Sequence, residues 1–204
     1  MIEPKVSILI PAYNAEETIE RALASIPRRD DVEVLVYDDG STDYTDDIAW
    51  DALAKYGLSG TVLGDTKNHG VAHAVNRLLD AAGGEWVVLL GSDDWFITDA
   101  FSLVVDMLKP TLDLVYFNLE INSGEIWRLT NETKGNCCGS VKFMRRKFVG
   151  DTHCKEDIKS GEDYYFYCEL LQKSPREAFT NITVKHYNFP REGSLSDLKR
   201  RGKL

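Results

Sequence analysis

The sequence predicts a single α/β domain with a mostly parallel central sheet flanked by helices. Three observations support this prediction: a length of 204 residues, a globular composition with 43% hydrophobic and 28% charged residues, and alternating strand and helix patterns up to about residue 118. A length near 150 residues is typical of one domain. Alternating strands and helices form βαβ units, in which the strands are parallel and the crossovers right-handed.

Short apolar runs predict five strands in the first part of the chain, at residues 6–10, 32–37, 61–63, 86–90 and 112–117. Pro11 bounds the first run, and the fourth, Trp-Val-Val-Leu-Leu, is apolar throughout, as expected for a strand buried on both faces.

The segments after the first four runs carry apolar residues at the three- and four-residue spacing of one helical face. These faces comprise Ile19, Ala22, Leu23 and Ile26; Ala49, Ala52, Leu53 and Tyr56; Val71, Val75, Leu78, Leu79 and Ala82; and Phe101, Val104, Val105 and Leu108. Asn14, with Glu17 three residues later, predicts a capping box for the first helix. Pro110 ends the fourth.

The pattern weakens after residue 118. Residues 121–130 suggest a hairpin around Asn122-Ser123-Gly124, and residues 164–171 suggest an aromatic-rich helix that opens at Ser160-Gly161-Glu162-Asp163. The last 14 residues hold five basic side chains and are expected to form a solvated tail.

Composition narrows the function classes. The formal net charge of −9 argues against nucleic-acid binding, which needs clustered Lys and Arg. No run approaches the roughly 18 apolar residues of a membrane span, and the N-terminus lacks the pattern of a secretory signal. The four cysteines form no Cys-x-x-Cys pair and suggest reduced thiols. We therefore expect a cytoplasmic protein without an integral membrane segment.

Ligands of parallel α/β sheets bind beyond the carboxyl ends of the strands. This rule points to residues 11–14, 38–43, 64–70 and 91–95. In the second of these, Asp38 and Asp39 end a strand before Gly40. Turn formation and helix capping explain the Ser and Thr that follow, but not both carboxylates. A carboxylate here suits a ring N–H donor such as that of uracil.

Asp93 and Asp94 follow the apolar fourth strand. Adjacent carboxylates repel unless a cation lies beside them, and Mg²⁺ or Mn²⁺ holding a diphosphate provides one. The alternative interpretation is a loop that caps the helix starting near Thr98.

Glu162 and Asp163 open the last clear helix. Their acidity suits the helix dipole, and it also suits a general base that deprotonates an attacking hydroxyl. Before the third helix, Asn68 and Gly70 favour a turn where phosphate can approach the backbone. His69 and His73 are four residues apart, a spacing that permits a metal pair but more commonly serves structure.

Taken together, the opening Val-Ser-Ile-Leu-Ile-Pro-Ala-Tyr-Asn and the later Asp-Asp-Gly-Ser resemble family 2 glycosyltransferases of the GT-A fold. Asn68-His69-Gly70, Ser92-Asp93-Asp94 and Gly161-Glu162-Asp163 follow in the family's order. The resemblance covers residues 4–100 strongly and 138–172 moderately. It implies a GT-A domain over 1–190, with a nucleotide-sugar half (1–118) and an acceptor and catalytic-base half (119–190), followed by a basic tail (191–204).

The resemblance also implies an inverting, metal-dependent transfer of a sugar from a nucleotide diphosphate donor, most plausibly a UDP-sugar, to a hydroxyl. Asp163 would be the general base with Glu162 beside it, and Asp94 would be the direct ligand of Mn²⁺ or Mg²⁺, supported by Asp93. The implied nucleotide-sugar residues are Pro11, Ala12, Tyr13, Asn14, Asp39, Asn68, Gly70, Ser92 and Asp93.

The chain departs from the family at three places. Gly91 stands where the family often has Asp, and Val75 where it often has Arg. The segment 186–196 matches the family's terminal pattern only loosely, so a role of His186 in a metal shell is open. Two rival functions therefore stay open: a non-catalytic nucleotide-sugar-binding protein of the same fold and a nucleotidyltransferase. The acceptor, whether glycan, lipid-linked sugar, protein or modified nucleobase, is not specified.

Overall fold

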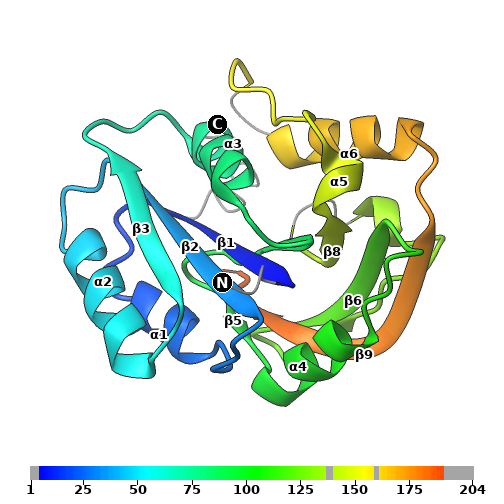
Figure 1. The fold of residues 1–204 in the computed structure, drawn as a ribbon, viewed down its shortest axis with the longest axis horizontal. Coiled ribbons are helices and arrows are strands. Elements are labelled where there is room, and N and C mark those ends of the chain that lie inside the picture. The colour runs from blue at the N-terminus through cyan, green and yellow to red at the C-terminus, as the bar shows by residue number, and fades with distance from the viewer. Residues whose placement is uncertain (1–4, 137–139, 159–160, 191–204) are drawn as a thin grey trace.

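The structure is a computed structural model that describes residues 5–136, 140–158 and 161–190 (Figure 1). The predicted tail at 191–204 and the cysteine pair at 137–138 lie outside the described residues. No helix in the described segments has the length and apolar character needed to span a membrane.

The described residues form one nine-stranded sheet in the order β3-β2-β1-β4-β8-β6-β9-β5, with β7 paired to β6. The strands are β1 (Val6–Ala12), β2 (Val32–Asp39), β3 (Gly60–Asp65), β4 (Trp86–Leu89), β5 (Trp95–Phe96), β6 (Leu114–Ile121), β7 (Ile126–Trp127), β8 (Lys142–Arg145) and β9 (Glu177–Tyr187). The helices are α1 (Ile19–Ala24), α2 (Thr45–Tyr56), α3 (Val71–Ala81), α4 (Thr98–Met107), the 3₁₀ turn η1 (Lys134–Asn136), α5 (Arg146–Val149) and α6 (Glu162–Gln172).

Helices cover both faces of the sheet (Figure 1). One core contains the apolar side chains of α1, α2 and α4, and the other those of α3, α5 and α6. Successive residues of a strand point to opposite faces, so in β1 Ile8 and Ile10 enter the first core and Leu9 enters the second. This two-sided burial explains why the predicted strands are continuous apolar runs.

The first half of the sheet confirms the predicted parallel pairing. Strand β1 lies parallel to both β2 and β4, and β2 lies parallel to β3. The carboxyl ends of these four strands therefore meet at one edge, as the site prediction requires.

The second half differs from the prediction. The expected fifth strand is β6, but it does not pair with β4, because β8 lies antiparallel between them. Strand β9, which runs parallel to β6, was not predicted either. Strand β8 has only four residues, and the β6–β9 register shifts on both sides of Asn118, so neither strand carries a regular sequence pattern. The predicted hairpin at 121–130 is confirmed by the β6–β7 pairing.

The predicted capping box of the first helix is wrong. Helix α1 begins at Ile19 after Thr18, and no side chain caps it. Asn14 instead has a positive φ of 47°, and its Oδ1 accepts a hydrogen bond from the backbone N–H of Thr42 at 2.9 Å. Its polar side chain joins the loop after β1 to the loop after β2 rather than starting a helix.

Candidate functional site

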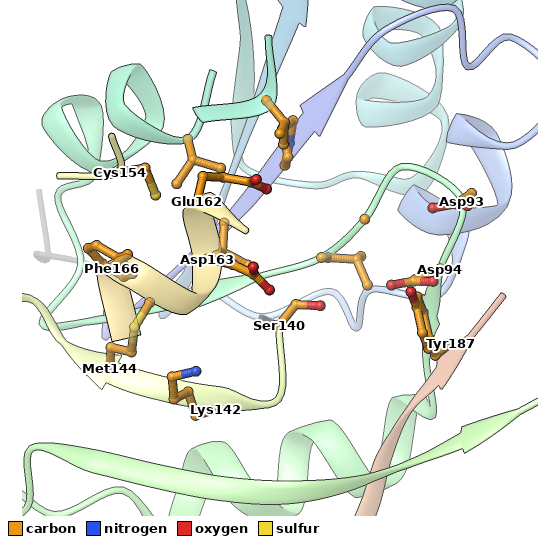
Figure 2. A pocket seen from close by; sticks show the side chains of 16 residues that line it. Asp93, Asp94, Ser140, Lys142, Met144, Cys154, Glu162, Asp163, Phe166 and Tyr187 are labelled. Atoms are coloured by element: carbon orange, nitrogen blue, oxygen red, sulfur yellow. The ribbon is translucent and has the colours of Figure 1, made fainter. Parts of the chain in front are cut away.

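One cavity lies at the carboxyl edge of the sheet and brings together residues from distant parts of the chain (Figure 2). Five of the predicted site residues contribute to its wall: Pro11, Asp93, Asp94, Glu162 and Asp163. Asp93 and Asp94 lie on one side, and Glu162 and Asp163 of α6 lie on the other (Figure 2). Strand β8 closes the cavity with Lys142 and Met144.

The turn after β4 brings the carboxylates of Asp93 and Asp94 close to Gly91. Asp94 donates its backbone N–H to the carbonyl of Gly91 at 3.0 Å. A Cβ atom at Gly91 would lie 3.0 Å from Oδ2 of Asp94 and 3.1 Å from Oδ1 of Asp93. The glycine therefore leaves room for the two carboxylates to converge, and the extra carboxylate that the family often has here would crowd them.

Asp94 is fully engaged within the protein. Asp94 is 2% exposed. Its Oδ2 accepts a hydrogen bond from Nζ of Lys185 at 2.9 Å, and its Oδ1 accepts one from the backbone N–H of Asn188 at 2.9 Å. Lys185 also donates to Oγ of Ser140. A buried carboxylate that already holds an ammonium group does not fit the role of direct metal ligand.

Of the two adjacent aspartates, Asp93 is the one that fits a metal ion in the cavity, whose wall it lines. One carboxylate can serve here, because Mg²⁺ commonly takes only one or two protein carboxylates together with the phosphates of a nucleotide. The backbone carbonyl of Asp93 accepts from Nη2 of Arg21 at 2.8 Å. Arg21 in turn lies 4.0 Å above the ring of Trp95, which stacks on His186 with ring centroids 3.9 Å apart. The Nε2 atom of His186 lies 3.0 Å from Oδ1 of Asn122, so this histidine makes no contact with either motif aspartate among the contacts described.

The described residues contain no cluster of three or more His, Cys, Asp or Glu side chains arranged as a metal site. Of the possible metal pair His69 and His73, His73 instead contacts Asp65 and Glu156. The ring nitrogens of His73 lie 3.1 Å from Oδ2 of Asp65 and 3.2 Å from Oε2 of Glu156. Hydrogen bonds from Tyr37 and His73 lower the pKa of the Asp65 carboxyl, whereas burial and the contact with Asp65 raise the pKa of Tyr37 to about 12.

The opposite wall places two carboxylates at the first turn of α6. Gly161 precedes them with a φ of 88°, a left-handed conformation that glycine adopts without strain. Cys154 and Phe166 supply apolar surroundings. Burial, with the nearby charges of Glu162 and Asp163, raises the pKa of the Cys154 thiol to about 12, which favours the protonated thiol near neutral pH.

Asp39 connects the end of β2 to the loop before α3. Asp39 is 2% exposed, and its carboxylate accepts hydrogen bonds from the backbone N–H groups of His69 at 3.0 Å and Gly70 at 2.7 Å. Asp38 accepts from Ser41, which closes the turn between β2 and α2. Val71, the residue after Gly70, lines the cavity, so Asp39 lies next to the cavity through this loop.

Five other predicted residues are not among those that line the cavity. Ala12 is buried, Tyr13, Asn14 and Asn68 are exposed, and Ser92 is partly buried. Sequence reasoning missed Lys142, Lys185, Arg21 and Glu156. A sequence signal existed for the two lysines, because each interrupts an otherwise apolar or β-branched segment. A charged residue in such a segment is expected to have an interaction partner in the interior.

Comparison with known proteins gives a consistent result. The sequence model described as glycosyl transferase family 2 matches residues 7–160. The chain is 34% identical over 203 residues to the PGL/p-HBAD biosynthesis glycosyltransferase of Mycobacterium tuberculosis, covering 92% of this chain and 78% of that protein. It is 30% identical over 213 residues to chondroitin synthase of Escherichia coli, covering 97% of this chain but 30% of that protein. The chain thus spans about a third of that longer relative.

Solved structures resemble the fold. S. aureus TarS 1-349 in complex with UDP-GlcNAc superposes with a TM-score of 0.80 at 23% identity, covering 93% of this chain and 60% of that chain. The mannosyltransferase PcManGT from Pyrobaculum calidifontis, in complex with GDP-Man and Mn2+, superposes with a TM-score of 0.71 at 22% identity, covering 98% and 61%. These likenesses confirm the expected GT-A fold.

Proposed function

The chain belongs to glycosyl transferase family 2, and from this premise we propose that it transfers a sugar from a nucleotide diphosphate donor to a hydroxyl acceptor. The proposed donor is a UDP-sugar, and the proposed course is inversion at the anomeric carbon. The UDP-GlcNAc complex of TarS supports the choice of donor.

One observation carries the proposal: Asp93 and Asp163 face one another across a single cavity at the carboxyl edge of the sheet (Figure 2). Transfer with inversion needs charge compensation at the leaving diphosphate and a base on the opposite side of the sugar. The two walls of the cavity supply a carboxylate for each task.

The donor half, residues 1–118, would bind the nucleotide through the loops after β1, β2 and β3. Asp39 holds Gly70 in place and keeps further carboxylate lone pairs for the ring N–H of the base. The other residues proposed to contact the nucleotide sugar are Pro11, Ala12, Tyr13, Asn14, Asn68, Ser92 and Asp93.

The second half, residues 119–190, would position the acceptor and deprotonate it. Asp163 takes the proton from the attacking hydroxyl, which then forms the new glycosidic bond while the donor's bond to its diphosphate breaks. Because a single base on one face suffices, no covalent intermediate forms. Mn²⁺ or Mg²⁺, when bound, would offset charge on the leaving diphosphate, and Asp93 is the side chain that would hold it. The Mn2+ complex of PcManGT supports the use of a divalent metal ion.

The test is nucleotide release by the purified chain from a panel of UDP-, GDP- and dTDP-sugars, with Mn²⁺ and with a chelator. We expect slow hydrolysis of one donor. Binding of a nucleotide sugar without release, in the presence of varied hydroxyl acceptors, would favour the non-catalytic rival. Release of pyrophosphate from nucleoside triphosphates and sugar phosphates would favour a nucleotidyltransferase.

A further inference from the structure

Much of the cavity surface is apolar, although the cavity also holds the carboxylates proposed for catalysis. Side chains of α3, β4, β8, α6 and the segment before α6 form what we call the apolar lining, which comprises Val71, Val75, Leu89, Met144, Cys154 and Phe166. We infer that the apolar lining is a subsite for a methyl group carried by the donor sugar. The methyl group is that of an acetamido substituent or of a 6-deoxy sugar. This inference rests on the proposed function, because it names the class of sugar that the same site transfers.

The size of the cavity fits a sugar ring better than a whole nucleotide sugar. Its volume is about 250 Å³, below the roughly 300–1,000 Å³ of pockets that enclose drug-sized ligands. Tyr13, Asn14 and Asn68, which are proposed to contact the nucleotide sugar, are exposed and do not line the cavity. The nucleotide is therefore expected outside it, with the reacting sugar inside, between Asp93 and Asp163.

The apolar lining lies where ring substituents of that sugar would meet it. Figure 2 shows Met144, Cys154 and Phe166 together on the side of the cavity away from Asp93. A sugar whose diphosphate is near Asp93 would therefore turn its far side toward these three residues.

Two departures of the chain from its family converge on this cavity. Val75 stands where the family often has Arg, and Gly91 where it often has Asp, and both residues line the cavity. Each departure replaces a charged side chain with a small or apolar one. The cavity of this chain is thus more apolar than one carrying both charges, which favours a less polar substituent on the sugar.

The apolar lining is also held in place by packing. Val75, Met144, Cys154 and Phe166 belong to the second core and are between 2% and 6% exposed, and the other two members are partly buried and pack against that core. Such side chains cannot turn away from a ligand. A hydroxyl group pressed against them would lose its hydrogen bonds to water without replacement, whereas a methyl group would gain from burial.

The test compares donors that differ only in the methyl group. Calorimetric Kd values and nucleotide release are measured in Mn²⁺ for the hexose, its N-acetylhexosamine and its 6-deoxyhexose, in the gluco, galacto and manno series. All carry UDP, or GDP or dTDP if that nucleotide binds more tightly. In at least one series we expect a methyl-bearing donor to exceed its parent hexose about tenfold or more in affinity and in kcat/KM. Preference for the N-acetyl or for the 6-deoxy member identifies the source of the methyl group.

Val75→Thr tests whether the apolar lining produces this preference, because threonine has nearly the shape of valine but carries a hydroxyl. We expect the preference for the methyl-bearing donor to fall about fourfold or more. Val105→Thr is the matched control, a buried helical valine that does not line the cavity, and should leave the preference unchanged. Thermal denaturation checks folding, and if Val75→Thr does not fold, Val71→Thr at a partly buried position of the same helix decides.

The outcomes separate the two proposals. Absence of binding and of release for every nucleotide and nucleotide sugar overturns the proposed function. Donor binding and release in which the parent hexose equals or exceeds its methyl-bearing partners in all three series overturns only the inference about the apolar lining. A methyl preference that the valine substitutions on α3 leave unchanged overturns it as well.

Discussion

The side-chain amide of Asn76 pairs with the backbone of Cys154 as one strand pairs with another. Nδ2 of Asn76 donates to the carbonyl of Cys154 at 3.0 Å, and Oδ1 accepts from its N–H at 2.8 Å. The same Nδ2 donates to Glu156 at 2.8 Å. Helix α3 is thereby fastened to the segment that leads to α6, whose first turn carries Asp163.

Asn76→Asp should weaken this connection. The substitution replaces the donor with a second carboxylate beside Glu156, at a position that is only 3% exposed. We expect a loss of about 2–3 kcal/mol in the free energy of unfolding and faster hydrogen exchange at the Cys154 amide. Urea denaturation and exchange mass spectrometry measure both. Asn131→Asp, at an exposed turn, is the matched control and should change stability by less than about 0.5 kcal/mol. Equal effects at the two positions would contradict the pairing.

Asp163→Asn should abolish turnover while donor affinity stays unchanged. A general base contributes about 10²- to 10⁴-fold to a rate, and asparagine cannot accept the proton. The measurement is kcat in the nucleotide-release assay together with a calorimetric Kd for the donor. Glu162→Gln is the neighbouring control and should lower kcat less than tenfold, because Glu162 is not the proposed base. If Glu162→Gln proves the more damaging, the two roles are reversed.

Gly40→Ala should destabilise the protein more than Gly57→Ala. Both glycines have positive φ, 72° and 62°, so each substitution carries about 1 kcal/mol of backbone strain. Only at Gly40 would the new Cβ meet backbone atoms, those of Lys67, at 2.4 Å, whereas at Gly57 the nearest atom lies 3.5 Å away on a flexible side chain. We expect an additional cost of about 1–3 kcal/mol at Gly40 in chemical denaturation. Similar losses of stability at both sites would show that the loop before α3 can move away from a Cβ atom at residue 40.

Asp113 should make stability depend on acid pH. Two hydrogen bonds from the Arg176 guanidinium, at 2.8 and 2.7 Å, lower the pKa of the Asp113 carboxyl. A carboxyl whose pKa is lower in the folded than in the unfolded state stabilises the fold at pH values above its unfolded-state pKa, which is near 4. This stabilisation disappears as the pH falls through the folded-state pKa. Asp113→Asn should therefore cost about 2 kcal/mol at pH 7 and progressively less below about pH 4. Urea titrations from pH 7 to pH 2 check this, and parallel curves for wild type and variant would refute it.

The sequence was informative where burial is two-sided and the chain alternates regularly. Strands β1, β2 and β4 were predicted because both of their faces enter cores, which demands unbroken apolar runs. Asp93 was singled out because it follows a buried strand and Asp163 because it opens a helix, and both line the cavity. Lys185 and Lys142 were not found, since only the three-dimensional arrangement of β8 and β9 in the sheet brings Lys142 to the cavity and Lys185 to Asp94. Asn14 was misassigned because its preference for turns is local, whereas its partner Thr42 lies 28 residues away.

The position of β8 has a consequence for the order in which the chain can assemble. Strands β4 and β6 both precede β8 in the sequence, yet each uses one edge to pair with it. A growing chain that has not reached Lys142 therefore carries two sheet edges that lack the strand between them. Closure of the sheet, and with it the cavity wall that holds Lys142, becomes a late event in folding, governed by contacts between residues far apart in sequence. The cavity is therefore complete only when the middle of the sheet is complete.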